Sequence, residues 1–168
     1  VRQVIGTFNP QACAVTGFRR PTELEYRHDY LWRVHQVLPP AGTVGVFNRS
    51  HYEDVLVTRV HRMITAKECT RRFREINDFE RMLSANGVTI LKFMLHVSRA
   101  EQAKRLADRL RDPQKNWKYD ANDLAERARW NDYTRAYVDA LAQCSTEWAP
   151  VATCALSWST VSSMRSVC

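Results

Sequence analysis

The sequence predicts an α/β fold, a three-layer α/β/α sandwich built around a parallel sheet. Short runs rich in β-branched and aromatic residues alternate with longer stretches that carry helix-start signals. These runs are continuously apolar, as expected of strands covered by helices on both faces, and the stretches between them are long enough for parallel crossovers. We expect strands at residues 13–18, 44–47 and 88–97.

Four Ser or Thr residues, each followed three positions later by Glu, mark the expected helix starts, because such a pair can satisfy two backbone amides reciprocally. The pairs are Thr22/Glu25, Ser50/Glu53, Thr65/Glu68 and Ser98/Glu101. The first helix is expected to continue to Leu38, where Pro39 and Pro40 stop it. The helix after Thr65 is expected to end at Asn86-Gly87, which suits a left-handed terminus.

A fifth helix is expected over residues 122–143, because apolar side chains recur there at helical spacing. They are Leu124, Ala128, Tyr133, Tyr137 and Leu141. The last stretch differs from the rest of the chain, since Arg165 is its one charged residue and Ser and Thr are frequent. We therefore divide the chain into a domain at residues 1–150 and a divergent tail at 151–168, and we expect neither strand nor helix in the tail.

The composition favours an anionic partner. The 168 residues include 25 Lys and Arg against 18 Asp and Glu, a net charge of +7, although a solvated basic face would have the same composition. No apolar run approaches the roughly 18 residues of a spanning helix, and no signal peptide opens the chain, so we expect no membrane partner. The five cysteines show no paired metal-ligand spacing, which favours reduced thiols and a cytoplasmic location.

Arginine follows every predicted strand. Arg19, Arg49 and Arg99 stand at or just after the three strand ends. Parallel sheets bind ligands beyond the carboxyl ends of their strands, and the planar guanidinium suits phosphate oxygens, so we expect the three side chains to line one rim that grips a polyanion. The alternative is that strand ends are simply exposed and charged.

The stretch at residues 46–54 combines a strand, a polar turn and a helix start. The free amides of a helix start favour a phosphate, and Glu53 and Asp54 could hold Mg²⁺ among phosphate oxygens. A capping role alone would also explain Glu53. We interpret His51 as a packing or hydrogen-bonding residue and not as a general base, because phosphoryl transfer needs little covalent help from protein groups.

A second basic concentration occurs at Lys104, Arg105, Arg109 and Arg111, and it is followed by a polar loop with aromatic residues and by Arg127. We expect a lid over a phosphate site at about residues 111–130, because closure excludes water from the transferring group. A solvated helix face is the alternative for the arginines. Aromatic residues between basic ones could also stack nucleic-acid bases.

Several ordered motifs resemble those of the family-2 polyphosphate kinases, which belong to the P-loop kinase superfamily. The likeness covers residues 1–150 and is carried by residues 8–11 (FNPQ), 29–35 (DYLWRVH), 47–56 (FNRSHYEDVL), 75–80 (EINDFE), 90–93 (ILKF), 117–119 (WKY) and 145–150 (STEWAP). The resemblance implies a P-loop kinase-like fold and a magnesium-dependent phosphotransferase acting between inorganic polyphosphate and a nucleoside di- or monophosphate, with adenine or guanine as the base.

The resemblance also implies roles for individual residues. Asn48-Arg49 matches a Walker-B-like strand end, where Asn48 is the variant associated with use of nucleoside monophosphates. We expect Arg49, Asp54 and Arg109 to act on the transferring group and Glu53 with Asp54 to hold Mg²⁺. The residues expected to bind the phosphates or nucleotide are Asn48, Arg19, Arg105, Lys118 and Arg127.

One expected motif is missing from the chain. The family's first strand and its Walker A loop, rich in glycine and ending in Gly-Lys, should precede Val1, and the five glycines present form no such loop. We therefore expect this chain to be inactive alone, and the full-length protein to be a homo-oligomer without a nucleic-acid partner. Two other functions stay open: a non-catalytic module that binds polyanions or nucleic acid, and an ATP-dependent nucleotide kinase.

Overall fold

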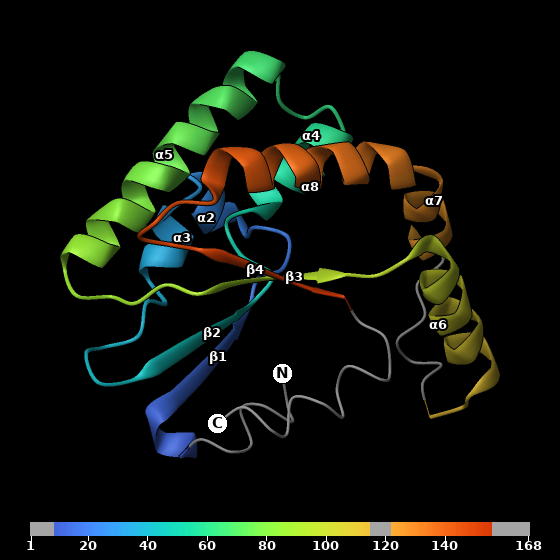
Figure 1. Cartoon of the computed structure of the whole chain (residues 1–168), viewed down its shortest axis with the longest axis horizontal. Helices are drawn as coiled ribbons and strands as arrows, with labels where there is room; N and C mark the ends of the chain where they lie inside the picture. The colour runs from blue at the N-terminus through green and yellow to red at the C-terminus, as the bar shows by residue number, and fades with distance from the viewer. Residues whose placement is uncertain (1–8, 115–121, 156–168) are drawn as a thin grey trace. The chain divides into compact units, whose positions relative to one another are not determined.

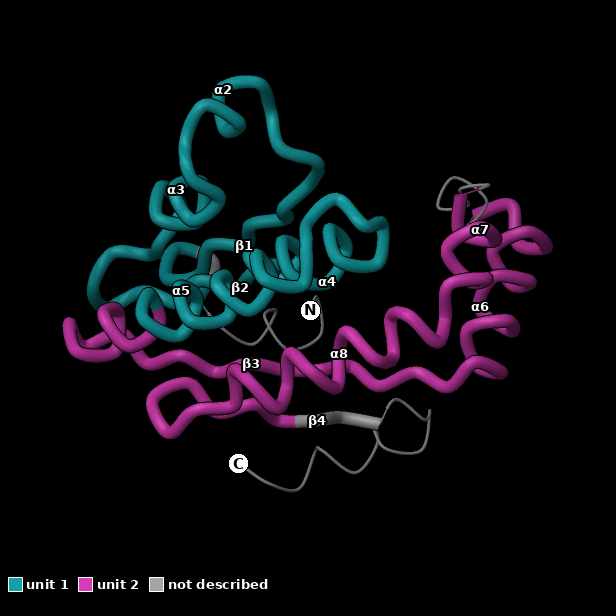
Figure 2. Tube along the Cα trace, turned by 90° about the horizontal axis from the view of Figure 1, so that it is seen from above, with its two compact units in different colours: residues 1–79 teal, residues 80–168 magenta. Residues whose placement is uncertain are grey.

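The computed structural model describes residues 9–114 and 122–155, which form an α/β structure with parallel strands (Figure 1). The chain divides into two compact units, Val1–Phe79 and Glu80–Cys168, and the long helix α5, Ala66–Ala85, runs through the boundary (Figure 2). The predicted α/β class and the parallel strand pairing are confirmed.

Unit 1 is built on one parallel strand pair. Its elements before α5 are the 3₁₀ helix η1 (Pro10–Ala12), β1 (Cys13–Gly17), α2 (Glu23–Tyr26), α3 (Trp32–His35), β2 (Val44–Asn48) and α4 (Glu53–Val60). Strand β1 pairs with β2 from Cys13 opposite Val44 to Gly17 opposite Asn48. Buried apolar side chains from the end of β1 and from the helices form the core: Phe18, Val34, Val55, Leu56, Val60, Cys69, Phe73 and Ile76.

Unit 2 is built on a second parallel pair. After the end of α5 it contains β3 (Lys92–His96), α6 (Arg99–Arg111), α7 (Asn122–Ala128), α8 (Trp130–Cys144) and β4 (Val151–Ala155). Lys92 lies opposite Val151, and His96 lies opposite Ala155. The ammonium of Lys92 is 2.7 Å from the carboxylate of Glu80, which is 1% exposed, so a buried ion pair joins β3 to α5. No helix in the part of the chain described is long and apolar enough to cross a bilayer.

The predicted helix over residues 22–38 is wrong as one continuous element, because the structure has two short helices there. The carboxylate of Asp29 accepts hydrogen bonds from the amides of Leu31 and Trp32 at 2.9 and 3.1 Å. Such a side-chain bond competes with the helical backbone pattern and starts a new turn. The hydroxyl of Tyr30 also donates to α5, which holds the break in place.

Three of the four predicted helix starts are confirmed at the level of the cap. Thr22 and Glu25 form a complete capping box, and the hydroxyls of Thr65 and Ser98 each accept the amide of the residue three positions on. At the fourth position a helix does begin, at Glu53, but the predicted cap is wrong, because no side-chain cap bond is formed at the start of α4. There the hydroxyl of Ser50 accepts the amide of Tyr52 at 3.4 Å.

The predicted helix over residues 122–143 is interrupted at Arg129, where the chain changes direction between α7 and α8 (Figure 1). The buried stripe of α8 consists of Ala136, Ala140 and Cys144, not of the expected aromatic residues, and Tyr137 is 37% exposed. Small side chains four residues apart lie on one face of the helix and allow it to pack closely. The bulkier side chains of α8 then lie on its more exposed faces.

The expectation of a tail without a strand is wrong at its beginning, since Val151–Ala155 form β4. Backbone hydrogen bonds to β3 require no particular side chains, and the first bond, from the amide of Lys92 to the carbonyl of Pro150, is 3.2 Å long. Residues 156–168 lie outside the described part of the chain.

The expected sheet is not continuous among the described residues, which form two separate two-stranded sheets. Their strands are also less covered than the apolar runs predicted. Val15 is 52% exposed, Phe93 68% and Leu95 58%. A sheet of two strands offers little surface for helices to pack against on both faces. The apolar sequence of a strand does not by itself show how much of that strand is covered by helices.

Candidate functional site

The carboxyl edge of the β1–β2 pair carries two of the predicted arginines. The amide of Phe18 donates to the carbonyl of Asn48 at 3.2 Å, so the pairing continues one residue beyond Gly17. Arg19 follows Phe18, and Arg49 follows Asn48, so the backbones of the two arginines leave the same edge of unit 1. The strand register thus places the two backbones at one edge, and the convergence of the two side chains on a single rim stays a prediction.

The backbone of Arg49 adopts the left-handed conformation, with φ of 62°. Residues other than glycine rarely occupy this region, and such conformations concentrate at functional sites. The turn leads from β2 into α4 and leaves the Arg49 side chain 66% exposed, 3.9 Å from the carboxylate of Glu53. The exposed guanidinium is therefore available to a phosphate group.

Arg33, which the sequence analysis did not single out, fixes the turn after β1. Its Nη2 donates to the carbonyl of Arg19 at 2.8 Å, and its guanidinium lies 4.9 Å from the ring centre of Phe18. Its Nε is 3.6 Å from the carboxylate of Glu25, and the Arg33 side chain is only 9% exposed. The one signal in the sequence was its place within the motif at residues 29–35.

The acidic pair at the start of α4 is half-buried. The side chain of Glu53 is 32% exposed and that of Asp54 21%, and burial is the main cause that raises the pKa of both carboxyl groups. Arg49 lowers the pKa of Glu53 in opposition, and Arg72 does the same for Asp54. The carboxylate of Glu53 lies 3.9 Å from the guanidinium of Arg49, and that of Asp54 lies 3.7 Å from the guanidinium of Arg72.

These two carboxylates fit a magnesium site that is completed by other ligands. Desolvated carboxylates with long ion pairs keep oxygen atoms able to accept a cation, and Mg²⁺ commonly takes one or two protein carboxylates together with water and substrate phosphates. Among the residues the structure describes, no group of three or more His, Cys, Asp or Glu side chains is placed to hold a metal. Glu53 and Asp54 would therefore share the ion with phosphate oxygens.

His51, in the turn before α4, is 8% exposed. Its ring centre is 4.9 Å from that of Tyr52 and 6.0 Å from that of Phe79. This environment agrees with the interpretation of His51 as a packing residue.

Two arginines of the second basic concentration, Arg105 and Arg109, have partners within unit 2. The Nε of Arg105 donates to Glu101 at 2.8 Å on the same helix. Arg109 on α6 donates to Asp123 on α7 at 3.0 Å, and both side chains of this pair are more than a third exposed. The pair links α6 to α7, and α7 lies within the predicted lid at about residues 111–130.

A second link between α6 and α7 uses Arg127, whose Nη1 donates to the carbonyl of Arg99 and to the side chain of Gln102, both at 2.8 Å. Arg99, at the start of α6, belongs to unit 2, so its predicted alignment with the arginines of unit 1 stays a prediction. Lys118 and the central part of the predicted lid, residues 115–121, lie outside the described residues.

The chain matches the family model described as polyphosphate kinase 2 (PPK2) over residues 1–161. It is 49% identical over 150 residues to the AMP/ADP-polyphosphate phosphotransferase of Meiothermus ruber, covering 89% of this chain and 56% of that protein. It is 35% identical over 150 residues to the GDP-polyphosphate phosphotransferase of Mycolicibacterium smegmatis, covering 89% of this chain and 53% of that one.

The structure is similar to the crystal structure of polyphosphate kinase 2 from Arthrobacter aurescens TC1, with a TM-score of 0.88 and 52% identity over 90% of this chain and 53% of that one. The chain spans about half the length of the curated relatives it matches. The resemblance predicted over residues 1–150 is confirmed, and the family match continues beyond it. This chain belongs to the polyphosphate kinase 2 family.

Proposed function

We propose that this chain supplies the phosphate-gripping and metal-holding part of an enzyme that moves a phosphoryl group between inorganic polyphosphate and a nucleoside mono- or diphosphate. The observation that carries the proposal is the edge of the β1–β2 pair, where Arg19 and Arg49 leave the sheet beside the half-buried carboxylates of Glu53 and Asp54. Relatives named for polyphosphate and AMP, ADP or GDP support the substrate class.

The proposed chemistry is positioning and charge stabilisation, without a protein nucleophile. Phosphoryl transfer spreads negative charge over the equatorial oxygens of the migrating group, and arginine forks bind such oxygens in a fixed plane. In this scheme Arg49 contacts the phosphate chain at the strand end, and the carboxylates of Glu53 and Asp54 orient the metal. Bound Mg²⁺ would supply charge neutralisation between phosphate oxygens.

The nucleotide is expected to be an adenine nucleotide first and a guanine nucleotide second, because the relative from Meiothermus ruber, the more similar of the two compared above, is named for AMP and ADP. Asn48 before Arg49 further favours nucleoside monophosphates, through the family resemblance alone. A cytoplasmic location, a homo-oligomeric full-length protein and the roles of Arg105, Arg109, Lys118 and Arg127 stay predictions.

The test uses two proteins, because the printed sequence contains no glycine-rich loop ending in Gly-Lys. One is the chain itself, and the other is a chimaera that places the family's strand and loop in front of Val1. Each is incubated with polyphosphate, Mg²⁺ and either AMP or ADP, and the phosphorylated nucleotide is measured by ³¹P NMR and chromatography. We expect transfer by the chimaera and none by the chain alone.

The outcomes separate the three functions considered. Binding of polyphosphate without turnover in either protein, and without need for Mg²⁺, would favour a non-catalytic polyanion-binding module. Transfer from ATP with indifference to polyphosphate would favour a nucleotide kinase. Transfer by the chain alone would show that the glycine-rich loop is dispensable.

A further inference from the structure

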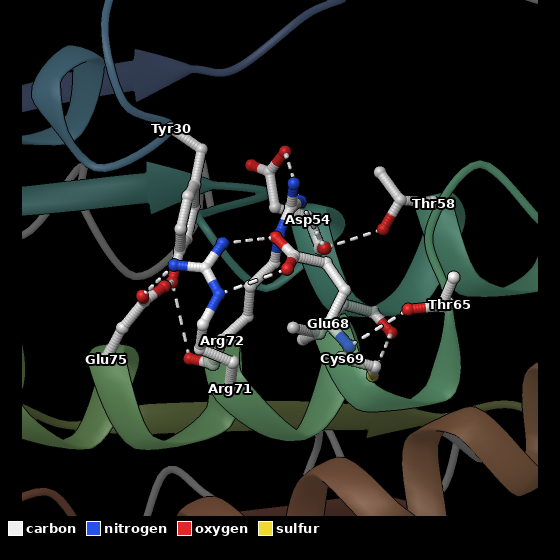
Figure 3. Close-up of polar contacts among 10 residues, drawn as sticks. Tyr30, Asp54, Thr58, Thr65, Glu68, Cys69, Arg71, Arg72 and Glu75 are labelled. Carbon is white, nitrogen blue, oxygen red and sulfur yellow. Dashed lines mark hydrogen bonds and ion pairs between the residues drawn. The ribbon is translucent and has the colours of Figure 1, made fainter.

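The carboxylate of Asp54 belongs to the first turn of α4. Helix α4 begins at Glu53 with no side-chain cap bond. Its first amides bond to the preceding backbone, from Glu53 to the carbonyl of Ser50 at 3.0 Å and from Asp54 to that of His51 at 3.1 Å, and these bonds leave the orientation of the Asp54 carboxylate to other contacts. The backbone carbonyl of Asp54 accepts the hydroxyl of Thr58 at 2.6 Å and the Nη1 of Arg72 at 2.9 Å (Figure 3). The same Nη1 lies 3.7 Å from the Asp54 carboxylate.

Arg72 thus holds Asp54 at two points, its backbone and its side chain. The two residues lie 18 positions apart, so the contact joins α5 to the first turn of α4. The side chain of Arg72 is 17% exposed, which limits competition from water for the two contacts.

The guanidinium of Arg72 is itself fixed on two further sides. Its Nε donates to Glu68 at 3.2 Å, and its central carbon lies 4.8 Å from the ring centre of Tyr30 (Figure 3). The hydroxyl of Tyr30 donates to the backbone carbonyl of Arg72 and to Glu75, at 3.3 and 3.1 Å. Burial and the neighbouring Glu75 raise the pKa of Tyr30, so the phenol keeps its proton for these bonds.

We propose that Arg72 is a positioning residue that orients Asp54 toward the metal and phosphate site at the edge of β2. The inference rests on the proposed function, in which Asp54 is one of two carboxylates that hold Mg²⁺. Groups behind a metal ligand commonly set its orientation, and their loss typically lowers metal affinity about 10- to 100-fold.

The arrangement requires arginine and not merely a positive charge. One planar group reaches Asp54 and Glu68 with different nitrogens while its face lies against the ring of Tyr30. A lysine ammonium is a single point on a flexible stem and cannot make these contacts together. Arg72→Lys therefore tests geometry separately from charge.

The experiment measures Mn²⁺ binding to the 168-residue chain by electron paramagnetic resonance of the free ion, with and without inorganic tripolyphosphate. The variants are Arg72→Gln and Arg72→Lys, and the matched control is Arg71→Gln. Arg71 is the preceding residue on α5, carries the same charge, and pairs with Glu68 and Glu75 on its own helix. Circular dichroism confirms that each variant is folded.

We expect both Arg72 variants to weaken Mn²⁺ binding, Arg72→Gln about tenfold, and Arg71→Gln to leave it unchanged. Equal affinities for Arg72→Gln, Arg71→Gln and the parent chain would overturn the proposal. If Arg72→Gln does not fold, Arg72→Lys decides: an unchanged Mn²⁺ affinity overturns the proposal, and a loss supports it.

An Asp54→Asn variant distinguishes this proposal from the function on which it rests. If Asp54→Asn leaves Mn²⁺ binding unchanged, Asp54 is not a metal ligand and the proposed metal site fails. If Asp54→Asn weakens binding and both Arg72 variants do not, the metal site stands and the positioning role of Arg72 fails.

Discussion

Replacement of Arg49 by glycine should weaken phosphate binding while leaving the protein more stable than replacement by alanine does. Arg49 combines a left-handed backbone, with φ of 62°, and an exposed guanidinium at the proposed phosphate site. Glycine occupies this conformation without steric conflict, whereas alanine does not. The comparison of Arg49→Gly with Arg49→Ala therefore isolates the backbone, because both variants lose the same side-chain contacts.

The magnitudes follow from the geometry. The left-handed conformation destabilises a residue with a Cβ atom by about 1–2 kcal/mol. Glycine avoids this strain, but its greater freedom in the unfolded chain lowers the free energy of unfolding by about 0.4–1 kcal/mol relative to alanine. The free energy of unfolding of Arg49→Gly should therefore exceed that of Arg49→Ala by about 0.5–1 kcal/mol. The ion pair to Glu53, at 3.9 Å and largely exposed, adds little in either case.

Binding of tripolyphosphate should fall equally in both variants, because both lose the same guanidinium. A charge-assisted phosphate contact contributes about 1.5–3 kcal/mol, so both variants should bind tripolyphosphate roughly ten- to hundredfold more weakly than the parent chain. Isothermal titration calorimetry measures the binding, and urea unfolding measures the stability. Undiminished binding by Arg49→Gly would remove Arg49 from the site. A glycine variant less stable than the alanine variant would contradict the strained backbone.

Three further results are expected. Lys92→Met removes the cation 2.7 Å from the buried carboxylate of Glu80 and should lower the free energy of unfolding by about 3–5 kcal/mol in urea titrations; a loss below 1 kcal/mol would contradict this. Asp54→Asn should raise the melting temperature at pH 7, because burial raises the native pKa of that carboxyl, which disfavours the charged form in the folded state. The difference should shrink as the pH falls through the raised native pKa and vanish below the ordinary value of 3.8, where the carboxyl is protonated in both states, and a gap independent of pH would refute it. Asp123→Asn should release Arg109 from its 3.0 Å ion pair and strengthen tripolyphosphate binding about two- to fivefold in calorimetry, whereas weaker binding would show that the pair supports the site.

Local patterns located the strands and the helix starts with fair accuracy. Strand β2 was predicted to within one residue, and three caps were placed correctly, because these features depend on neighbouring residues. Helix continuity was predicted less well. The turn at Asp29 was not evident from apolar spacing, because hydrogen bonds from its carboxylate to the backbone decide it. Apolar spacing did not show the interruption at Arg129 either.

Family membership, the two arginines at the strand ends and the acidic pair beside them could be read from the order of residues alone. Only the folded chain showed that Arg33 holds the backbone of Arg19 and that Arg72 reaches Asp54. The physical reason is that a strand end or a helix cap is determined by residues a few positions apart. The partners of a guanidinium can be carboxylates, carbonyls or rings from distant parts of the sequence. Which of them it contacts depends on which groups the packing of the chain brings close and on how far that packing excludes water from them.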